Sequence, residues 1–139
     1  MLPETVVRFL LDEAPVGHLA TVDADGSPQV TVAWFDVDDA GRLVFATLFE
    51  QRKLANLRRD PRCTVSFTSS RSNPVGMAWY VVVRGTAEVT EGGAPELLHR
   101  LAQRYVGPGT RFPPMDAPPA GFTTAITPTD VRGVGPWSD

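Results

Sequence analysis

The chain is poor in the residues that build covalent and metal cross-links. Its 139 residues include one cysteine, Cys63, and two histidines, His18 and His99. A single cysteine excludes an intramolecular disulfide and a cysteine-rich zinc site. The two histidines lie far apart in the sequence and form no ligand pair. We therefore expect no metal centre, and we expect Cys63 to be a small buried hydrophobe.

Long apolar runs and common catalytic motifs are also missing. No run approaches the length of about eighteen residues that a membrane span needs. No basic-then-apolar signal segment opens the chain, so a cytoplasmic location without a membrane partner is expected. The sequence has no G-x-S-x-G, no H-E-x-x-H, no P-loop and no dinucleotide-type glycine fingerprint. These absences disfavour the hydrolase and nucleotide-binding classes that the motifs mark.

Charge and composition indicate a globular protein that does not bind nucleic acid. Thirteen basic residues against sixteen acidic ones give a net charge of −3, which disfavours nucleic acid as a partner. Hydrophobic residues make up 42% and charged residues 21% of the chain, which is enough apolar material for a packed core. We predict one domain over residues 1–139, with a partly ordered tail from about residue 131.

Hydrophobic periodicity and turn residues predict a mainly β fold with short helices. The predicted helices cover 2–13, 50–59 and 95–106, and the predicted strands cover 17–22, 29–37, 43–48, 63–68, 77–90 and 122–127. Acidic–glycine turns join the first three strands as an antiparallel meander. Polar or proline-rich loops are predicted over 69–74 and 107–121, and Gly85 is expected to mark a β-bulge. These elements predict a small six-stranded antiparallel barrel with helices over its openings.

The start of the second predicted helix carries the strongest chemical signal. A predicted strand ends near Thr47, and the helix that follows opens with Arg52 and with Lys53, the only lysine. A helix N-terminus has free N–H groups and a positive dipole end, so cations placed there oppose the helix. A bound anion, typically a phosphate, would offset that conflict. The alternative is a solvated basic helix.

Aromatic residues on strands form a second candidate set. Trp34, Trp79 and Tyr80 all fall in predicted strands. Aromatics at such positions usually pack in the core. They can also provide a flat wall for a planar ring, or form a dimer interface.

The order of these elements resembles the flavin-binding split-barrel family, the superfamily of pyridoxamine phosphate oxidase. The resemblance rests on the order and spacing of short motifs: Gly17-His18-Leu19-Ala20-Thr21-Val22, Asp25-Gly26-Ser27-Pro28, Thr47 followed by Lys53, Asn56-Leu57, Asp60-Pro61-Arg62 and the strand from Trp79 to Glu88. It covers roughly residues 5–133. Within the family, the chain is most similar to a small bacterial branch that uses the deazaflavin coenzyme F420.

The resemblance implies a homodimer of split barrels with two cofactor sites at the interface. By the family pattern, four residues would bind the cofactor phosphate or ribityl chain: Thr47, Arg52, Lys53 and Asn56. The strand around Val32, Ala33 and Trp34 would lie along the ring system. Tyr80 would approach from the partner subunit or flank the same site. No catalytic acid is implied.

Two departures from the family pattern bear on the cofactor. The oxidases carry two further basic residues that complete the FMN phosphate site, and here the matching positions, near Thr31 and Asp36, are not basic. That difference favours F420 over FMN. The chain also lacks the C-terminal substrate-binding extension of the oxidases, so oxidation of the vitamin is not expected.

The resemblance therefore implies an F420-dependent oxidoreductase that transfers a hydride to or from a small organic substrate. The loop over 107–121 is where we expect selection of that substrate. Two alternatives stay open at this point. One is an FMN-dependent oxidase or reductase of the same fold, and the other is a non-catalytic protein that binds a flavin, haem or a tetrapyrrole.

Overall fold

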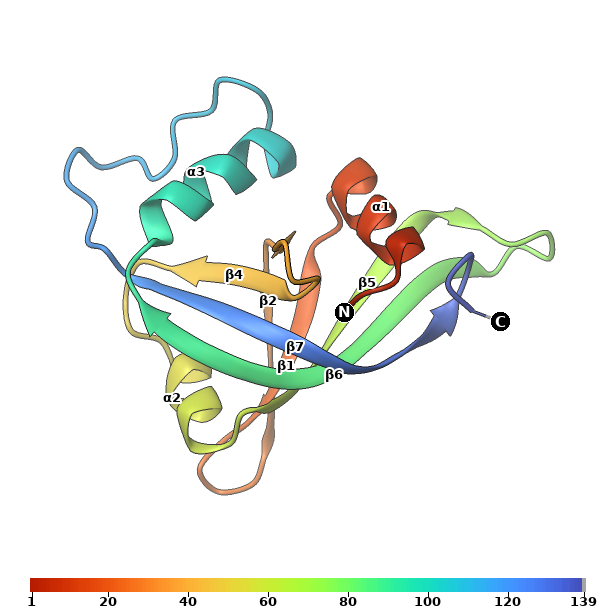
Figure 1. Ribbon diagram of the computed structural model, residues 1–139, viewed down its shortest axis with the longest axis horizontal. Helices are drawn as coiled ribbons and strands as arrows, with labels where there is room; N and C mark the ends of the chain where they lie inside the picture. The colour runs from red at the N-terminus through yellow and green to blue at the C-terminus, as the bar shows by residue number, and fades with distance from the viewer. Residues whose placement is uncertain (139) are drawn as a thin grey trace.

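The computed structural model describes residues 1–138 and is mainly β, as predicted. One antiparallel sheet contains seven strands: β1 (Gly17–Val22), β2 (Pro28–Ala33), β3 (Asp36–Val37), β4 (Leu43–Thr47), β5 (Arg62–Ser72), β6 (Ala78–Glu91) and β7 (Phe122–Val134). Three helices accompany it: α1 (Glu4–Glu13), α2 (Arg52–Arg59) and α3 (Ala94–Tyr105). Figure 1 shows α3 lying over β4, with α2 at the other side of the sheet.

The strand order explains how the sheet closes on itself. The order is β2-β1-β5-β6-β7-β4-β3, so β2 and β3 lie at opposite edges although they follow one another in the chain. Trp34 and Phe35 connect the two edges. Phe35 is fully buried, and its ring centroid lies 5.5 Å from that of Phe45 and 5.4 Å from that of Phe67. Burial of this side chain draws the connection across the end of the split barrel.

This crossing corrects the predicted strand over residues 29–37. The segment divides at Trp34 and Phe35 into β2 and β3, and the sheet therefore has seven strands instead of the predicted six. Apolar residues continue through the division without a glycine or proline, so the local pattern predicts no break. The core contacts of Phe35 override that preference.

Two other strands are longer than predicted. β5 runs through Ser72, where a loop was predicted from Ser69. The Glu13 carboxylate accepts hydrogen bonds from the hydroxyl of Ser69 at 2.8 Å and from the N–H of Ser70 at 3.0 Å, and these bonds fix the extension. β7 continues to Val134, beyond the predicted end at residue 127, because it pairs with β6 along its whole length.

The predicted bulge at Gly85 is confirmed. The pairing of β6 with β7 shifts register between Arg84 and Gly85. A Cβ atom at Gly85 would lie 2.5 Å from the carbonyl oxygen of Thr127, so a side chain there would push the two strands apart. The bulge bends the long strand β6, which curves across the view in Figure 1 with α2 and the β1–β2 hairpin below it.

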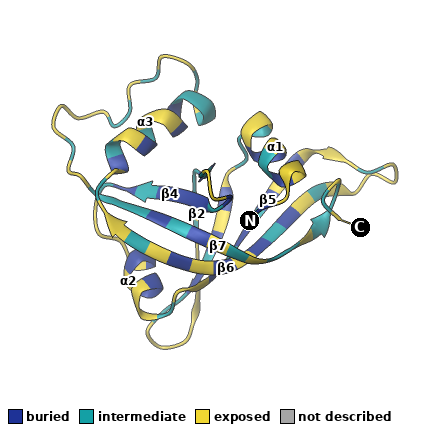
Figure 2. Ribbon diagram, in the orientation of Figure 1, coloured by how far each residue is buried: buried dark blue, intermediate teal, exposed yellow. Residues whose placement is uncertain are grey.

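The core lies between the sheet and the helices. Buried and exposed residues alternate along β6, as Figure 2 shows, because successive side chains point to opposite faces of a strand. Cys63 belongs to the main core cluster, and burial raises the pKa of its thiol to about 12. The expectation that Cys63 is a buried hydrophobe is thus confirmed. Within residues 1–138, every helix is too short or too polar to cross a lipid bilayer.

Candidate functional site

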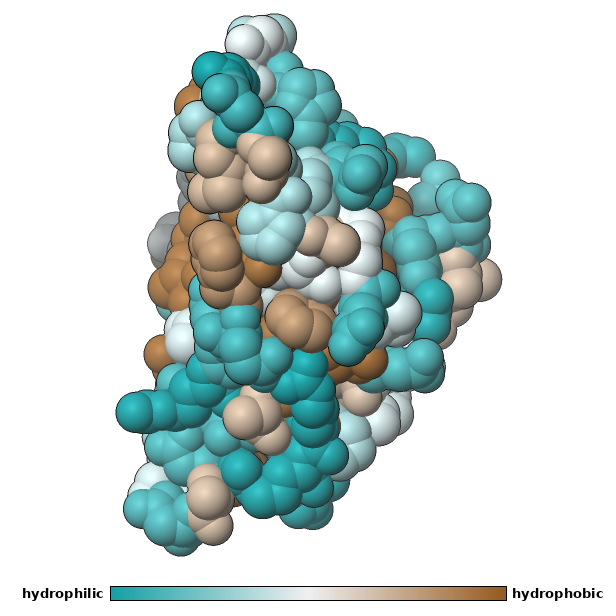
Figure 3. Space-filling model, turned by 90° about the vertical axis from the view of Figure 1, so that its left-hand side faces the viewer, coloured by the Kyte–Doolittle hydropathy of each residue, from teal (hydrophilic) through white to brown (hydrophobic). Residues whose placement is uncertain are grey.

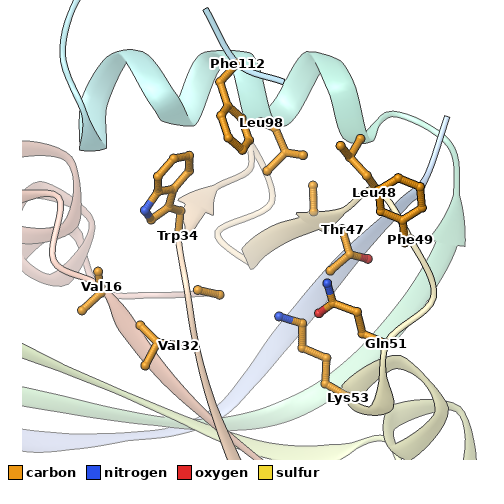
Figure 4. A pocket seen from close by; sticks show the side chains of 12 residues that line it. Val16, Val32, Trp34, Thr47, Leu48, Phe49, Gln51, Lys53, Leu98 and Phe112 are labelled. Carbon is orange, nitrogen blue, oxygen red and sulfur yellow. The ribbon is translucent and has the colours of Figure 1, made fainter. Parts of the chain in front are cut away.

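A cavity of about 360 Å³ lies where the β2–β3 crossing meets the β4–α2 connection, with α3 above it. Figure 4 shows the side chains that line it. They come from five separate segments: Val16; Val32, Ala33 and Trp34; Ala46, Thr47, Leu48, Phe49, Gln51 and Lys53; Leu98; and Phe112. Most of the lining is apolar. The few polar groups are therefore the ones that decide what the cavity can hold.

Lys53 is the most unusual of these polar groups. The residue is 7% exposed, and no carboxylate within residues 1–138 forms an ion pair with it. Its Nζ atom lies 5.3 Å from the centroid of the Phe45 ring. Burial lowers the pKa of its ammonium group. A buried cation without an anionic partner is costly, so the cavity favours a negatively charged or oxygen-rich guest.

Thr47 places a second unsatisfied group in the same cavity. Its hydroxyl oxygen is buried and has no hydrogen-bond partner among the described residues. Thr47 is the last residue of β4 and pairs with Phe122 of β7, so its backbone position is fixed by the sheet. A buried hydroxyl without a partner costs about 1–3 kcal/mol, which a ligand can recover. Thr47 and Lys53 thus both line the cavity, and neither side chain has a hydrogen-bond partner among the described residues.

The N-terminus of α2 borders the same wall. Gln51 occupies the N-cap position with an extended backbone, and no side chain caps the helix. The N–H groups of Leu54 and Ala55 both bond to the carbonyl of Gln51, which leaves the earlier N–H groups of the first turn for another acceptor. The positive end of the helix dipole reinforces the charge of Lys53 here.

Aromatic residues form the opposite wall. The Trp34 ring stacks on Tyr105 of α3, with centroids 5.5 Å apart and an interplanar angle of 16°. The Phe112 ring lies 5.4 Å from Trp34 at an angle of 59°. The Tyr105 hydroxyl accepts a hydrogen bond from the N–H of Phe35 and donates one to the carbonyl of Pro15. Trp34 is therefore held on a rigid support, and Leu98 completes the wall in Figure 4.

Asp36 secures α3 above the cavity. Its buried carboxylate accepts hydrogen bonds from Arg100 Nε and Arg104 Nη1, each at 3.0 Å. Burial alone would raise the pKa of Asp36, but the N–H of Val37 and the two arginines lower it below the ordinary value. The resemblance places one of the family's two further basic residues near Asp36. In this chain Asp36 docks a helix, and neither it nor Thr31 lines the cavity.

The structure brings together five of the eight predicted site residues. Val32, Ala33, Trp34, Thr47 and Lys53 all line the cavity. The other three, which are Arg52, Asn56 and Tyr80, do not line it.

Arg52 and Lys53 do not converge on one point, although they are adjacent in sequence. Successive residues of a helix point about 100° apart. The Arg52 side chain is 68% exposed, and its Nη1 atom lies 3.9 Å from Asp23 Oδ2. Only Lys53 turns into the cavity. The predicted pair of cations therefore supplies one cavity residue and one solvent-exposed residue.

Asn56 is occupied within the protein. Its side-chain amide lies 3.0 Å from the Thr21 hydroxyl, 2.9 Å from Asp23 Oδ1 and 3.1 Å from Gln29 Oε1. Its own oxygen accepts a hydrogen bond from Arg59 at 2.9 Å. These bonds tie α2 to the β1–β2 hairpin, which gives Asn56 a structural task.

Tyr80 lies on β6 and is 40% exposed. Its register partners are Thr68 on β5 and Val134 on β7. Its backbone carbonyl accepts a hydrogen bond from Trp137 Nε1 at 2.8 Å. The side chain is thus free to face another molecule, outside the cavity of its own chain.

Sequence reasoning missed several lining residues. Ala46, Leu48, Phe49 and Gln51 flank the predicted residues along the chain, and adjacency to Thr47 was the available signal. Val16 and Leu98 come from distant segments and are apolar, so no motif marks them. Phe112 lies in the loop over 107–121, where substrate selection was expected, but the sequence did not single out this residue. Their role becomes visible only when the helices are docked on the sheet.

The cavity can bind and shield a planar group that carries polar oxygens at one end. The part of the chain that the structure describes has no cluster of three His, Cys, Asp or Glu side chains suited to a metal ion. Cys63 is buried and weakly acidic, so it is a poor nucleophile. A mostly apolar cavity with a few polar groups on one side suits an organic group.

Comparison with known proteins identifies the class. Residues 2–135 match the family model of pyridoxamine 5'-phosphate oxidase. The match covers nearly the whole chain, and the protein belongs to this family. The split-barrel architecture described above is the fold of the family.

Solved structures extend this result. An F420 reductase is 30% identical with a TM-score of 0.71, and the alignment covers 94% of this chain and 98% of the reductase. A conserved hypothetical protein, Rv2991, from Mycobacterium tuberculosis is 28% identical with a TM-score of 0.71, covering 99% and 86% of the two chains. The haem storage protein HutZ from Vibrio cholerae shares the fold at 17% identity and a TM-score of 0.64, over 96% and 95%.

Proposed function

We propose that the protein is an F420-dependent oxidoreductase that transfers a hydride between the deazaflavin and a small organic substrate. The observation that carries this proposal is the cavity wall with the buried cation of Lys53 and the unpaired hydroxyl of Thr47. The 30% identity to an F420 reductase over almost the full length of both chains supports the choice of cofactor.

The cavity residues fit a flat ring with polar oxygens. Lys53, Thr47 and the first turn of α2 would hold the oxygen-rich part of the cofactor. Val32, Ala33 and Trp34 would lie along its ring. At about 360 Å³ the cavity is near the small end of ligand pockets, which span about 300–1,000 Å³. The cavity has room for the ring system of the cofactor, and the tail of the cofactor would extend out of the cavity.

When bound, the deazaflavin supplies the hydride, as cofactors rather than proteins supply such chemistry. The chain's own residues bind, orient and exclude water. The apolar lining keeps the reacting centre dry, and the dry surroundings strengthen the field of the Lys53 ammonium. Tyr105 and Asp36 hold the roof helix α3 in place and do not touch the cavity contents.

We also propose that the functional unit is a homodimer. Val30 and Val32 on the edge strand β2 are 62% and 56% exposed. Register places Val32 beside His18, His18 beside Ser66 and Ser66 beside Val82 across the sheet. Tyr80 lies two residues from Val82 and so shares this outer face. A face with this much exposed apolar surface is typical of an interface.

The test of the cofactor is a direct titration. F420 and FMN are each titrated into the purified protein by calorimetry. We expect F420 to bind more tightly, because the two basic positions that FMN phosphate uses in the oxidases fall near Thr31 and Asp36 here, and neither residue is basic. Tighter binding of FMN would favour the FMN-dependent alternative. Binding of haem with neither flavin-type cofactor would contradict the oxidoreductase proposal.

The test of the dimer is light scattering at micromolar concentration. We expect a mass twice that of the 15.1 kDa chain. A clean monomer would contradict the dimer, and with it the contribution of Tyr80 from a partner subunit.

A further inference from the structure

We propose that Lys53 is a covalent attachment site, at which the side-chain amine of the cofactor-free protein forms an imine with small uncharged aldehydes. The proposal goes beyond the function given above and does not depend on which cofactor the protein binds. It follows from three features of Lys53: its burial, its lack of an ionic partner within residues 1–138, and its place in the wall of a cavity.

The carboxylates beside α2 pair with arginines and not with Lys53. Glu50, which precedes the helix, forms an ion pair with Arg58, and Asp23 lies 3.9 Å from Arg52. Among the residues that line the cavity, Lys53 is the only one with a titratable side chain. Because no opposite charge stabilises the ammonium form, burial lowers its pKa. The neutral amine, which is the nucleophilic form, is thereby favoured relative to that of an exposed lysine.

The amine lies in a space that a small molecule can enter. Figure 4 shows the Lys53 nitrogen pointing into the cavity of about 360 Å³. Val32 and Phe49 also line the cavity and are exposed to solvent, so the cavity opens beside them. Figure 3 views the molecule from the side on which β4 ends and α2 begins, and apolar patches lie there among polar ones. A small uncharged molecule can therefore reach the amine, although the Lys53 side chain is buried.

Imine formation at this site needs no reagent besides the aldehyde. The lone pair of the neutral amine adds to the carbonyl carbon, and a proton passes from nitrogen to oxygen through solvent. The resulting carbinolamine loses its oxygen as water, and a carbon–nitrogen double bond remains. Nothing is oxidised or reduced. The mostly apolar lining disfavours the water that would reverse the last step, so the imine is favoured.

The opposite expectation is that burial protects the amine. A lysine that is buried only as part of the fold reacts more slowly than the same lysine in the unfolded chain, because reagents do not reach it. An amine made nucleophilic by an accessible cavity reacts faster in the folded protein. The sign of the difference between the folded and the unfolded state therefore distinguishes the two expectations.

The experiment measures this difference near neutral pH. The full-length protein without cofactor is incubated with benzaldehyde and sodium cyanoborohydride, which reduces the imine to a stable benzylamine, in buffer or in guanidinium chloride. Peptide mass spectrometry gives the rate of labelling at Lys53, the only lysine of the chain, separately from that at the N-terminal amine. The matched control is Arg8→Lys, which adds a lysine on α1. The Arg8 side chain is 70% exposed and does not line the cavity.

We expect labelling of Lys53 to be at least about tenfold faster in the folded protein than in the unfolded chain, since each unit by which the pKa falls toward neutral pH raises the neutral fraction about tenfold. The lysine introduced by Arg8→Lys should react at similar rates in both states. Slower labelling of Lys53 in the folded protein would overturn the proposal. A folded-to-unfolded ratio no larger than that of the introduced lysine would overturn it as well.

The labelling experiment and the F420 titration fail separately. Absence of F420 binding contradicts only the proposed cofactor, and absence of faster labelling in the folded protein contradicts only the covalent site.

Discussion

Helix α2 carries two polar clusters, one around Asn56 and one around Lys53, which differ in whether their polar groups form hydrogen bonds within the protein. Around Asn56, the Thr21 hydroxyl, the Asp23 and Gln29 oxygens and an Arg59 N–H all find partners inside the protein. Around Lys53, neither the ammonium nor the hydroxyl of Thr47 has a hydrogen-bonding partner within residues 1–138. Asn56, Lys53 and Thr47 are all buried residues, and the resemblance to the family assigns all three to the cofactor.

This difference in hydrogen bonding distinguishes residues that hold the fold together from residues that are available to bind a ligand. Buried polar groups in native proteins are nearly always paired, because each unpaired one costs free energy. Polar groups that already form hydrogen bonds with one another gain little from hydrogen bonds to a ligand. The buried hydroxyls of Thr31 and Thr124 are also unpaired but do not line the cavity, so what sets Thr47 apart is its place beside the buried cation of Lys53 in the cavity wall. On this reasoning the Asn56 cluster is part of the scaffold and the Lys53 cluster is part of the site.

The largest effect is expected from Asn56→Ala. The change removes the amide that contacts the buried Thr21 and the half-buried Asp23 and Gln29, and it frees the β1–β2 hairpin from α2. We expect a loss of about 2–4 kcal/mol in the free energy of unfolding, measured by urea titration. The F420 affinity of the folded fraction should stay within about twofold of wild type. A stable variant with weak F420 binding would place Asn56 in the site and remove the contrast.

The second effect is expected from Lys53→Met, which keeps the length of the side chain and removes its charge. Loss of a charge-assisted contact of about 1.5–3 kcal/mol should weaken F420 binding about ten- to a hundredfold. The cofactor-free protein should be as stable as wild type or more so, since a desolvated cation is gone. Unchanged affinity in calorimetry would leave the anion site without support.

Measuring the free energy of unfolding over a series of pH values tests whether the Lys53 ammonium is desolvated. Burial lowers the pKa of Lys53 in the folded state below its ordinary value of 10.5. Between the folded pKa and 10.5, the unfolded chain binds more protons, so this group makes the folded state more stable as pH rises. The free energy of unfolding of wild type should therefore rise relative to Lys53→Met as pH is raised through this window. A constant difference would show that the ammonium is not desolvated.

A smaller effect is expected from Thr47→Val, in which a methyl replaces the unpaired hydroxyl. The cofactor-free protein should gain up to about 1 kcal/mol in the free energy of unfolding, because no buried hydroxyl remains unsatisfied. F420 binding should weaken about three- to tenfold. Thr47→Ser is the matched control and should keep the affinity. A destabilised Thr47→Val variant would mean that the hydroxyl has a partner inside the protein.

The smallest effect is expected from Arg52→Ala. This side chain is exposed and faces Asp23, and exposed ion pairs contribute about 0–1 kcal/mol. We expect stability within about 0.5 kcal/mol of wild type and a modest loss of F420 affinity that disappears in high salt. A loss as large as that of Lys53→Met, independent of salt, would restore the two residues as a pair.

The sequence alone predicted the hairpins, the helices and the bulge at Gly85, because turn residues and hydrophobic periodicity are local signals. It did not predict the division at Trp34 and Phe35, which depends on burial of Phe35 against residues far along the chain. The predicted extent of β5 failed for a similar reason, since the carboxylate of Glu13 supports that strand from another element.

In the candidate site, too, local sequence signals predict some residues, and contacts between distant segments determine the others. Lys53 and Thr47 could be named from their place at a strand end and a helix start. The separation of Arg52 from Lys53 follows from the helical turn and from the position of Asp23, which a linear motif does not describe. Leu98 and Phe112 reach the cavity only through the docking of α3, for which Asp36 and Tyr105 are responsible.

The environment of Cys63 has a practical consequence. The only thiol of the chain is buried and has a pKa near 12, so it stays protonated and shielded from alkylating reagents at neutral pH. A cysteine introduced on the surface would then be the sole site of labelling. A fluorophore attached in the loop that carries Phe112 could report how that loop responds to F420, without first removing a native residue.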